Sequence, residues 1–218
     1  MNADGTGGVE RLTTEDDGAF LKPYAWAPDG TMLLYSGGSG STGSDILFLS
    51  MSGEREPEVL IRTEFGESQP AVSPDGRWFA YMSRLSGQPE VYVERFPDLG
   101  DRKLVSTGGG SLPLWSSDGS ELFYLNRDSD ALMVVSIDSE AELTIGTPEV
   151  LFEGNFLSAF GLRTYDVTPD GQRFVMLTRG SAEIPGQDAA LLSSSSRTGS
   201  RSTRSLTGLR ESLSLPAS

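Results

Sequence analysis

Along this chain, hydrophobic positions either alternate with polar ones or run in short blocks between polar turns. The stretch Val72–Tyr81 shows the pattern: a hydrophobic strand leads into the turn Ser73-Pro74-Asp75-Gly76, and a second strand follows that is rich in aromatic residues. Hydrophobic residues at a period of two, with frequent turn signals, predict short strands and not helices. The chain is therefore expected to be all-β.

This strand–turn–strand unit occurs four times, as Trp26–Tyr35, Val72–Tyr81, Trp115–Tyr124 and Val167–Met176. The turn aspartates stand at positions 29, 75, 118 and 170, so successive units are 46, 43 and 52 residues apart. A four-stranded propeller blade takes about 40–45 residues. The repeat therefore predicts a β-propeller made of four-stranded antiparallel blades.

Three complete blades are predicted at about 20–63, 66–107 and 109–153, followed by a partial blade at 162–183. Inner strands are expected at Tyr24–Ala27, Ala71–Ser73 and Leu114–Ser116, and a glycine–serine loop is expected at 37–44. The fourth strand of the second blade is expected at Lys103–Ser106.

The two ends of the chain depart from the repeat. Residues 1–19 are predicted to hold the outer strand of a preceding blade, at Val9–Thr13, and a linker; a disordered terminus is the alternative. A chain that begins on an outer strand and ends within a blade is expected to be the C-terminal part of a longer propeller. The missing blades would then be its partners, and alone it should be marginally stable or associate.

Residues 184–218 are rich in Ser, Arg, Thr and Leu and are predicted to be a low-complexity, disordered tail. The tail interrupts a blade, because Ala189–Leu192 has the pattern of a third strand. A frameshift from about Ser193 is the alternative. One set of codons that encodes Ser195–Ser202 would encode the peptide Val-Gln-Asn-Trp-Phe-Glu-Glu if it were translated in a shifted frame.

The turn chemistry explains the repeated residues. Proline fixes the first turn dihedral, aspartate accepts hydrogen bonds from backbone N–H groups, and glycine takes the positive φ that precedes the next strand. The aromatic residues after each turn, such as Trp78, Phe79, Phe123 and Phe174, are expected to pack between blades. The predicted structural turn residues are Asp29, Gly30, Asp75, Gly76, Asp118, Gly119, Asp170 and Gly171.

The amino-acid composition argues against several classes of partner and catalytic site. The net charge of −14 argues against nucleic acid as a partner, and the absence of cysteine and histidine excludes thiolate zinc sites and His-based catalytic triads. No hydrophobic run is long enough for a membrane helix, so this segment is not expected to insert into a membrane. No catalytic residue, cofactor or metal ligand is predicted.

Two patterns resemble ligand sites and are better explained otherwise. Gly38–Gly43 matches G-x-G-x-x-G, but a strand pattern and not a helix follows it, so a hairpin loop is favoured over a dinucleotide site. The acidic pairs Asp16-Asp17, Asp128/Asp130 and Asp138/Glu140 lack the spacing of a calcium hand and are interpreted as solvated turns.

The repeated Ser-Pro-Asp-Gly unit resembles the TolB-like, or WD-like, β-propeller repeat over about residues 5–180. Three segments are similar in sequence to the propeller that follows the kinase domain of bacterial serine/threonine protein kinases: Tyr92–Pro97, Val105–Gly110 and Pro113–Tyr124. In those proteins a kinase domain precedes a membrane helix, and the propeller follows that helix. The resemblance therefore implies that this propeller is a sensor or interaction module. The kinase motifs themselves are missing, so kinase activity is not carried over.

The resemblance therefore implies a non-catalytic module that binds a protein or peptide partner through its loops, with candidates at Arg84–Pro89, Phe96–Arg102 and Asn126–Asp130. The gating propeller of a prolyl-oligopeptidase-type serine peptidase and a periplasmic TolB-like envelope scaffold are the alternatives. The expected location is extracytoplasmic if the parent protein is anchored in a membrane, and cytoplasmic if the chain is expressed as written.

Overall fold

The computed structural model describes residues 4–12, 21–40, 43–53, 55–157 and 161–179, and the backbone of 192–196. Within these residues every regular element is a β-strand, and every strand pair is antiparallel. The chain divides into two compact units, Met1–Leu104 and Val105–Ser218.

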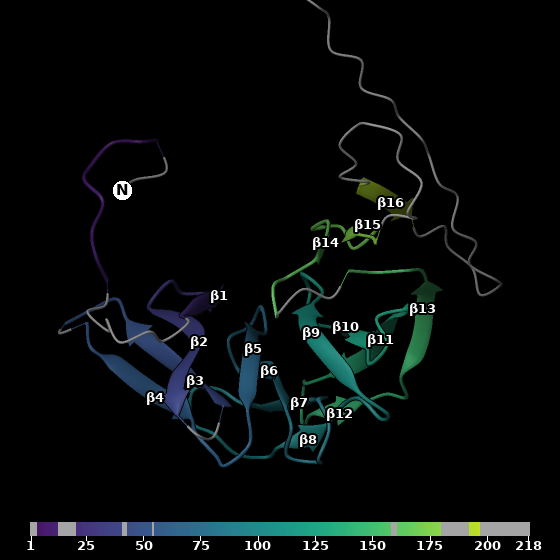
Figure 1. The fold of residues 1–218 in the computed structure, drawn as a ribbon, viewed down its shortest axis with the longest axis horizontal. Coiled ribbons are helices and arrows are strands. Elements are labelled where there is room, and N and C mark those ends of the chain that lie inside the picture. The colour runs from purple at the N-terminus through teal and green to yellow at the C-terminus, as the bar shows by residue number, and fades with distance from the viewer. Residues whose placement is uncertain are drawn as a thin grey trace, which may run out of the picture. The chain divides into compact units, whose positions relative to one another are not determined.

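The first unit contains two four-stranded meanders (Figure 1). In each sheet the strand order follows the chain, as expected for a propeller blade. The first sheet consists of β1 (Lys22–Trp26), β2 (Met32–Gly40), β3 (Gly43–Ser50) and β4 (Pro57–Ile61), and the second of β5 (Glu67–Val72), β6 (Trp78–Ser83), β7 (Glu90–Arg95) and β8 (Lys103–Leu104).

The second unit contains a five-stranded and a three-stranded sheet. In the larger sheet the outer side of β11 is shared: its last two residues pair with β12, and its first half pairs with β13. The larger sheet consists of β9 (Gly110–Trp115), β10 (Glu121–Asn126), β11 (Ala131–Asp138), β12 (Thr144–Ile145) and β13 (Glu149–Glu153), and the smaller of β14 (Tyr165–Val167), β15 (Arg173–Leu177) and β16 (Leu192–Ser196).

These sheets confirm the predicted fold: an all-β propeller array with three complete blades and a partial last one. The structure assigns no strand to residues 9–12. A strand there would need a partner from another blade, so the proposed outer strand of a preceding blade stays a prediction. Thr13 and most of the segment from 184 onward lie outside the described residues.

Several predicted boundaries were wrong. The glycine–serine loop expected at 37–44 is mostly strand, because β2 and β3 extend through it until Gly40 pairs with Gly43. The strand expected at Lys103–Ser106 ends at Leu104, and the two-residue β12 was not predicted. Leu192–Ser196 pairs with β15 as the third strand of the last blade, and it begins at the end of the segment Ala189–Leu192, whose pattern indicated the start of such a strand.

A β-bulge explains why the inner strands begin earlier than expected. The register of β5 against β6 shifts between Ser68 and Ala71, and the intervening Gln69 has a φ of +62°. In β9 the equivalent residue is Leu112, with a φ of +55°. A proline follows each of them in the chain. Proline reads as a strand breaker in sequence, but a bulge tolerates it because no ladder hydrogen bond is needed there.

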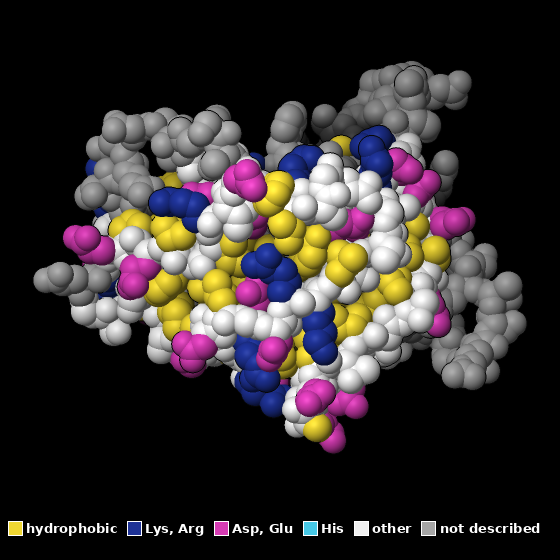
Figure 2. Space-filling view, turned by 90° about the horizontal axis from the view of Figure 1, so that it is seen from below, with side chains coloured by type: hydrophobic (Ala, Val, Ile, Leu, Met, Phe, Trp, Pro, Cys, Tyr) yellow, Lys and Arg dark blue, Asp and Glu magenta, His cyan; other side chains and the backbone are white. Residues whose placement is uncertain are grey.

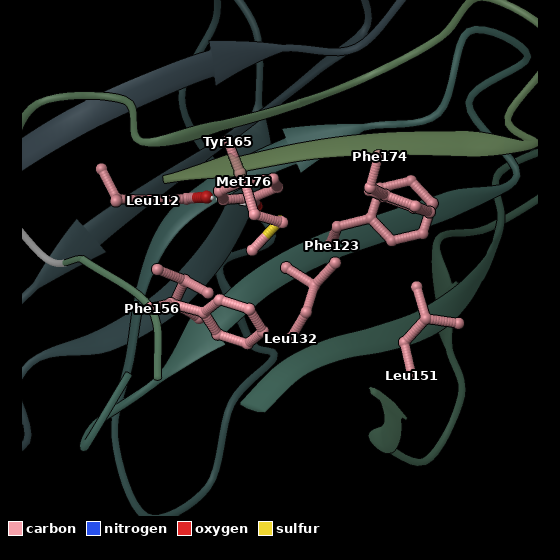
Figure 3. Close-up of a cluster of buried hydrophobic side chains, with 9 residues drawn as sticks. Leu112, Phe123, Leu132, Leu151, Phe156, Tyr165, Phe174 and Met176 are labelled. Atoms are coloured by element: carbon pink, nitrogen blue, oxygen red, sulfur yellow. Dashed lines mark hydrogen bonds between the residues drawn. The ribbon is translucent and has the colours of Figure 1, made fainter. Parts of the chain in front are cut away.

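Each unit buries its own hydrophobic core between neighbouring sheets. In the second unit, Phe123 and Leu132 of one blade meet Phe174 and Met176 of the next (Figure 3). The Phe123 and Phe174 rings meet edge to face, with centroids 5.0 Å apart. In the first unit the equivalent cluster consists of Ala27, Leu34, Ile46, Ile61, Phe79, Tyr81, Tyr92 and Phe96.

The outer side of the first blade is also partly covered. Tyr35, Leu47 and Leu49 are buried on the side facing away from the second blade, where Leu12 and Leu21 pack against them. Arg55 donates a hydrogen bond to Glu10 at 2.6 Å. The described part of the N-terminal segment therefore packs on the first blade.

Candidate functional site

The four repeated aspartates have the same surroundings. In each copy Oδ1 accepts a hydrogen bond from the backbone N–H two residues later, at 3.0–3.1 Å. The following glycine has a φ of +67° to +73°, and its N–H donates to the carbonyl three residues earlier at 2.8–3.0 Å. Each of these carboxylates is therefore engaged within its own turn. The residues are Asp29, Gly30, Asp75, Gly76, Asp118, Gly119, Asp170 and Gly171.

These hydrogen bonds lower the pKa of the turn aspartates. The hydroxyl of Ser116, followed by the N–H and hydroxyl of Ser120, lowers the pKa of Asp118 from 3.8 to about 2. For Asp75, burial acts to raise the pKa, but hydrogen bonds from Ser73 and Arg77 outweigh it and the pKa is lowered. Carboxylates that stay ionised at neutral pH are poor general acids.

The other sequence patterns do not form a ligand site in the described residues. Gly38 and Gly43 lie near the tip of the β2–β3 hairpin, and β3 follows them where a dinucleotide site requires a helix. Asp130 is held by Asn126, whose Nδ2 donates to it at 2.6 Å. Asp138 accepts from the N–H of Glu140 at 3.1 Å. Asp16-Asp17 lies outside the described residues.

Among the residues that the structure describes, no three of His, Cys, Asp or Glu come together in one cluster. None of its elements is a helix long and apolar enough to cross a membrane.

The candidate loops of the second blade lie at opposite ends of its sheet. The turn Ser73–Arg77 and the loop Phe96–Arg102 share one end, which we call the turn end, where the Phe96 N–H donates to Arg77 O at 2.9 Å. The loop Arg84–Pro89 lies at the other end, which we call the hairpin end, where the Arg84 N–H donates to Gly66 O at 3.3 Å. These two loops therefore cannot form one binding site.

The turn end of the second blade carries exposed cationic and hydrophobic side chains. Arg77 pairs with Asp75 at 2.7 Å, and Arg95 pairs with Asp101 at 2.5 Å; both arginine side chains are 56% exposed. The Arg95 guanidinium also lies 5.1 Å from the centroid of the Trp78 ring. Leu99 is 41% exposed.

The hairpin end of the second blade presents one exposed arginine, whereas its turn end presents two that are half-exposed. At the hairpin end Leu85 is 39% exposed and lies beside the exposed Arg84. In the third blade Asn126–Asp130 is a closed turn, because Asn126 Oδ1 accepts from the N–H groups of Asp130 and Ala131, both at 3.1 Å. One face of the molecule shows hydrophobic, basic and acidic side chains interspersed (Figure 2).

Sequence reasoning missed a group of buried acids on the strands of the first unit. They are Asp45, Glu67, Glu90 and Glu94, each at most 4% exposed. Arg62 pairs with Asp45 at 2.6 Å, and Arg102 pairs with Glu94 at 3.0 Å. Tyr81 also donates to Glu94, at 2.9 Å. No local signal marks Glu67, because it precedes the inner strand that the sequence predicts from Ala71.

Comparison with known proteins supports the fold. No family profile matches the chain. It is 27% identical over 177 residues to the uncharacterised protein Atu1656 of Agrobacterium fabrum, covering 78% of this chain and 58% of that protein. The chain thus spans less than two thirds of the curated relative that it matches.

Solved structures show the same architecture. TolB from Acinetobacter baumannii superposes with a TM-score of 0.58 at 21% identity, covering 78% of this chain and 40% of that one. A protein described as TolB from Agrobacterium tumefaciens gives 0.52 at 23% identity, with coverage of 65% and 51%. A puromycin-hydrolysing peptidase of Mycobacterium tuberculosis gives 0.56 at 19% identity, with coverage of 73% and 28%. The TolB-like propeller fold expected from the repeats is therefore confirmed.

Proposed function

We propose that this chain, which has the TolB-like propeller fold, is a non-catalytic module that binds a protein or peptide partner at the turn end of its second blade. The observation that carries the proposal is the grouping of two half-exposed arginines with the exposed Leu99 at this end. Arginine is enriched among the residues that dominate binding energy, and a hydrophobic side chain can fill a pocket on a partner.

The arginines are held in place before any partner arrives. Asp101 and the Trp78 ring fix Arg95, and Asp75 fixes Arg77. Side chains that are already ordered lose less conformational entropy on binding. The turn end therefore suits recognition of an extended peptide with hydrophobic and acidic residues.

A peptide-display selection on the full chain tests this proposal. We expect selected peptides to bind with micromolar affinity and to lose about tenfold in affinity with Leu99→Ala or Arg95→Ala. Leu85→Ala is the matched control, because Leu85 is similarly exposed but lies at the hairpin end. Fluorescence polarisation measures each affinity. Peptides that respond to Leu85→Ala and not to Leu99→Ala would contradict the proposed surface.

The non-catalytic assignment has its own test. The purified chain should neither transfer phosphate from ATP to a protein substrate nor cleave peptides. Turnover that scales with the concentration of the chain in either assay would overturn the assignment.

We propose that the whole protein is a receptor-type bacterial serine/threonine kinase and that this chain is part of its propeller. The sequences of Tyr92–Pro97 and Pro113–Tyr124 support this proposal. The likeness to the peptidase of Mycobacterium tuberculosis favours a gating propeller as a second candidate, and the TolB structures favour an envelope scaffold as a third. The surrounding gene sequence separates them. A kinase and a membrane helix upstream support the first, a serine-hydrolase domain downstream the second, and a signal peptide with a separate amino-terminal domain the third.

A further inference from the structure

At the hairpin end of the second blade, one oxygen of a buried carboxylate has no hydrogen-bond partner. Glu67 begins the inner strand β5 and is 1% exposed. Its Oε1 accepts from the hydroxyls of Thr63 at 2.6 Å and Ser83 at 3.1 Å. Its Oε2 is buried and accepts from no group of the protein. Buried carboxylates are normally paired, fully hydrogen-bonded or bound to a cation.

Basic side chains of the first unit do not supply this partner. Arg62 pairs with Asp45, and Arg102 pairs with Glu94. Arg102 is close enough for its field to act on Glu67, but its Nε donates to Glu94. The negative charge of Glu67 is therefore not matched by a direct ion pair.

A second buried glutamate lies on the same face of the sheet. Ser83 pairs with Glu67 on one side and with Glu90 on the other. Residues directly paired across strands share a face, so both glutamates flank the Ser83 hydroxyl. Glu90 is 3% exposed, and its Oε1 accepts from Gln88 Nε2 at 2.6 Å. The row places carboxylate and hydroxyl oxygens together in a region closed to solvent.

We propose that Glu67 Oε2 is a ligand of a calcium ion, with the Glu90 carboxylate and the Ser83 and Thr63 hydroxyls as the neighbouring oxygens that complete its surroundings. Hard cations bind such oxygens, and calcium accepts irregular geometry, whereas magnesium demands an octahedron and keeps several waters. Because both glutamates are almost fully buried, the ion that can shed its water fits better.

The site holds at most two carboxylates, since no three acidic or other metal-binding side chains converge in the described residues. Calcium affinity rises with the number of charged ligands, so we expect a dissociation constant on the order of 0.1–1 mM, as in extracellular modules. Binding would tie β5, β6 and β7 together at the hairpin end.

The test is a calcium titration of the full chain, followed by thermal unfolding and by equilibrium dialysis. We expect 10 mM calcium to raise the midpoint by roughly 3–8 °C and one ion to bind per chain. The same concentration of magnesium should raise it less. Absence of bound calcium, or a larger response to magnesium, would overturn the calcium assignment.

Two variants separate this site from the exposed acids of a chain with a net charge of −14. Glu67→Gln should weaken calcium binding at least tenfold, whereas Glu58→Gln removes the same charge from an exposed position of β4 and should leave binding unchanged. If Glu67→Gln does not fold, Glu90→Gln takes its place with the same expectation. If Glu67→Gln, or Glu90→Gln in its place, binds calcium as tightly as Glu58→Gln does, the ion is bound at the surface and the proposal is refuted.

Discussion

At the scale of single residues, the acids of this chain occupy two kinds of environment. The turn aspartates are exposed or nearly so and accept hydrogen bonds from their own turn. The strand glutamates, such as Glu67 and Glu94, are buried between blades and depend on groups from other strands. Local sequence therefore accounts for the first kind and not for the second.

The lowered pKa of Asp118 makes one turn sensitive to acid. Its pKa of about 2 lies below the ordinary 3.8, so its contribution to stability is complete above about pH 4 and is lost as the pH falls towards 2. Asp118→Asn should cost about 1 kcal/mol at pH 7, because solvent screens an exposed group. The difference from the unmodified chain should shrink towards pH 2 in urea unfolding. A difference independent of pH would contradict the turn hydrogen bonds.

Gly76 tests the backbone requirement of the turns. Its φ is +71°, and an added Cβ would meet only Pro28, at 3.7 Å from Cδ and 3.9 Å from Cγ, so strain and not collision decides the outcome. Gly76→Ala should destabilise the chain by about 1–2 kcal/mol. Gly66→Ala is the control, since its φ lies outside the positive region and its nearest neighbour is 3.9 Å away. Denaturant midpoints of both variants give the comparison, and equal losses would contradict the argument.

At the scale of elements, the bulge of the inner strand β9 connects two neighbouring blades. Tyr165 of β14 is buried, and its hydroxyl donates to the carbonyl of Leu112 at 2.6 Å (Figure 3). Leu112 is the bulge residue of β9 with positive φ. The bulge thus turns a backbone carbonyl towards the next blade, where a side chain satisfies it.

Removing this hydroxyl should therefore break the buried hydrogen bond to the Leu112 carbonyl. Tyr165→Phe is expected to cost about 1–3 kcal/mol in the free energy of unfolding, while the ring still fills its place in the core. Urea unfolding followed by circular dichroism measures the loss. A change below about 0.5 kcal/mol would show that the hydrogen bond contributes nothing net.

The two faces of β15 differ sharply. Phe174 and Met176 are buried in the core, whereas Val175 is 43% exposed on the opposite face. Phe174→Ala should cost about 3–5 kcal/mol, because a cavity would open beside Phe123 and Phe152. Val175→Ala on the same strand should cost at most about 0.5 kcal/mol. Similar losses for both variants in chemical denaturation would contradict the observed orientation of the strand.

At the scale of the whole molecule, each unit is held together by the stacking of two blades. The turns of adjacent blades also lie side by side, since Ser117 Oγ donates to Pro169 O in the second unit and Gly76 faces Pro28 in the first. Contacts of this kind join neighbours only, which is the usual source of stability in repeat proteins.

The third strand of the last blade gives a test at this scale. Because Leu192–Ser196 pairs with Arg173–Leu177, a chain ending at residue 179 would leave β15 with an open edge. We expect it to unfold with about 1–3 kcal/mol less stability than a chain ending at residue 196. Thermal and urea midpoints of the two truncated chains measure the effect. Equal midpoints would show that β16 adds nothing to the fold.

Much of the architecture could be predicted because its signals are local. Alternation over a few residues predicts a strand, and the Asp-Gly turns mark where each hairpin reverses, as at Asp75 and Asp118. The boundaries failed where a longer-range interaction decides the outcome. Pro70 and Pro113 look like strand breakers, yet the bulges that accommodate them exist because neighbouring strands continue the sheet.

The sequence by itself determined the repeat, the β class and the hairpin turns, because these follow from chain-local geometry and the period of two. Only the tertiary structure decided which acids became buried, which end of a blade each loop occupies, and where Tyr165 finds its acceptor. These depend on the packing of one blade against the next, between residues such as Leu112 and Tyr165 that lie far apart in the chain. For the same reason the unpartnered oxygen of Glu67 appears only once the blades are assembled.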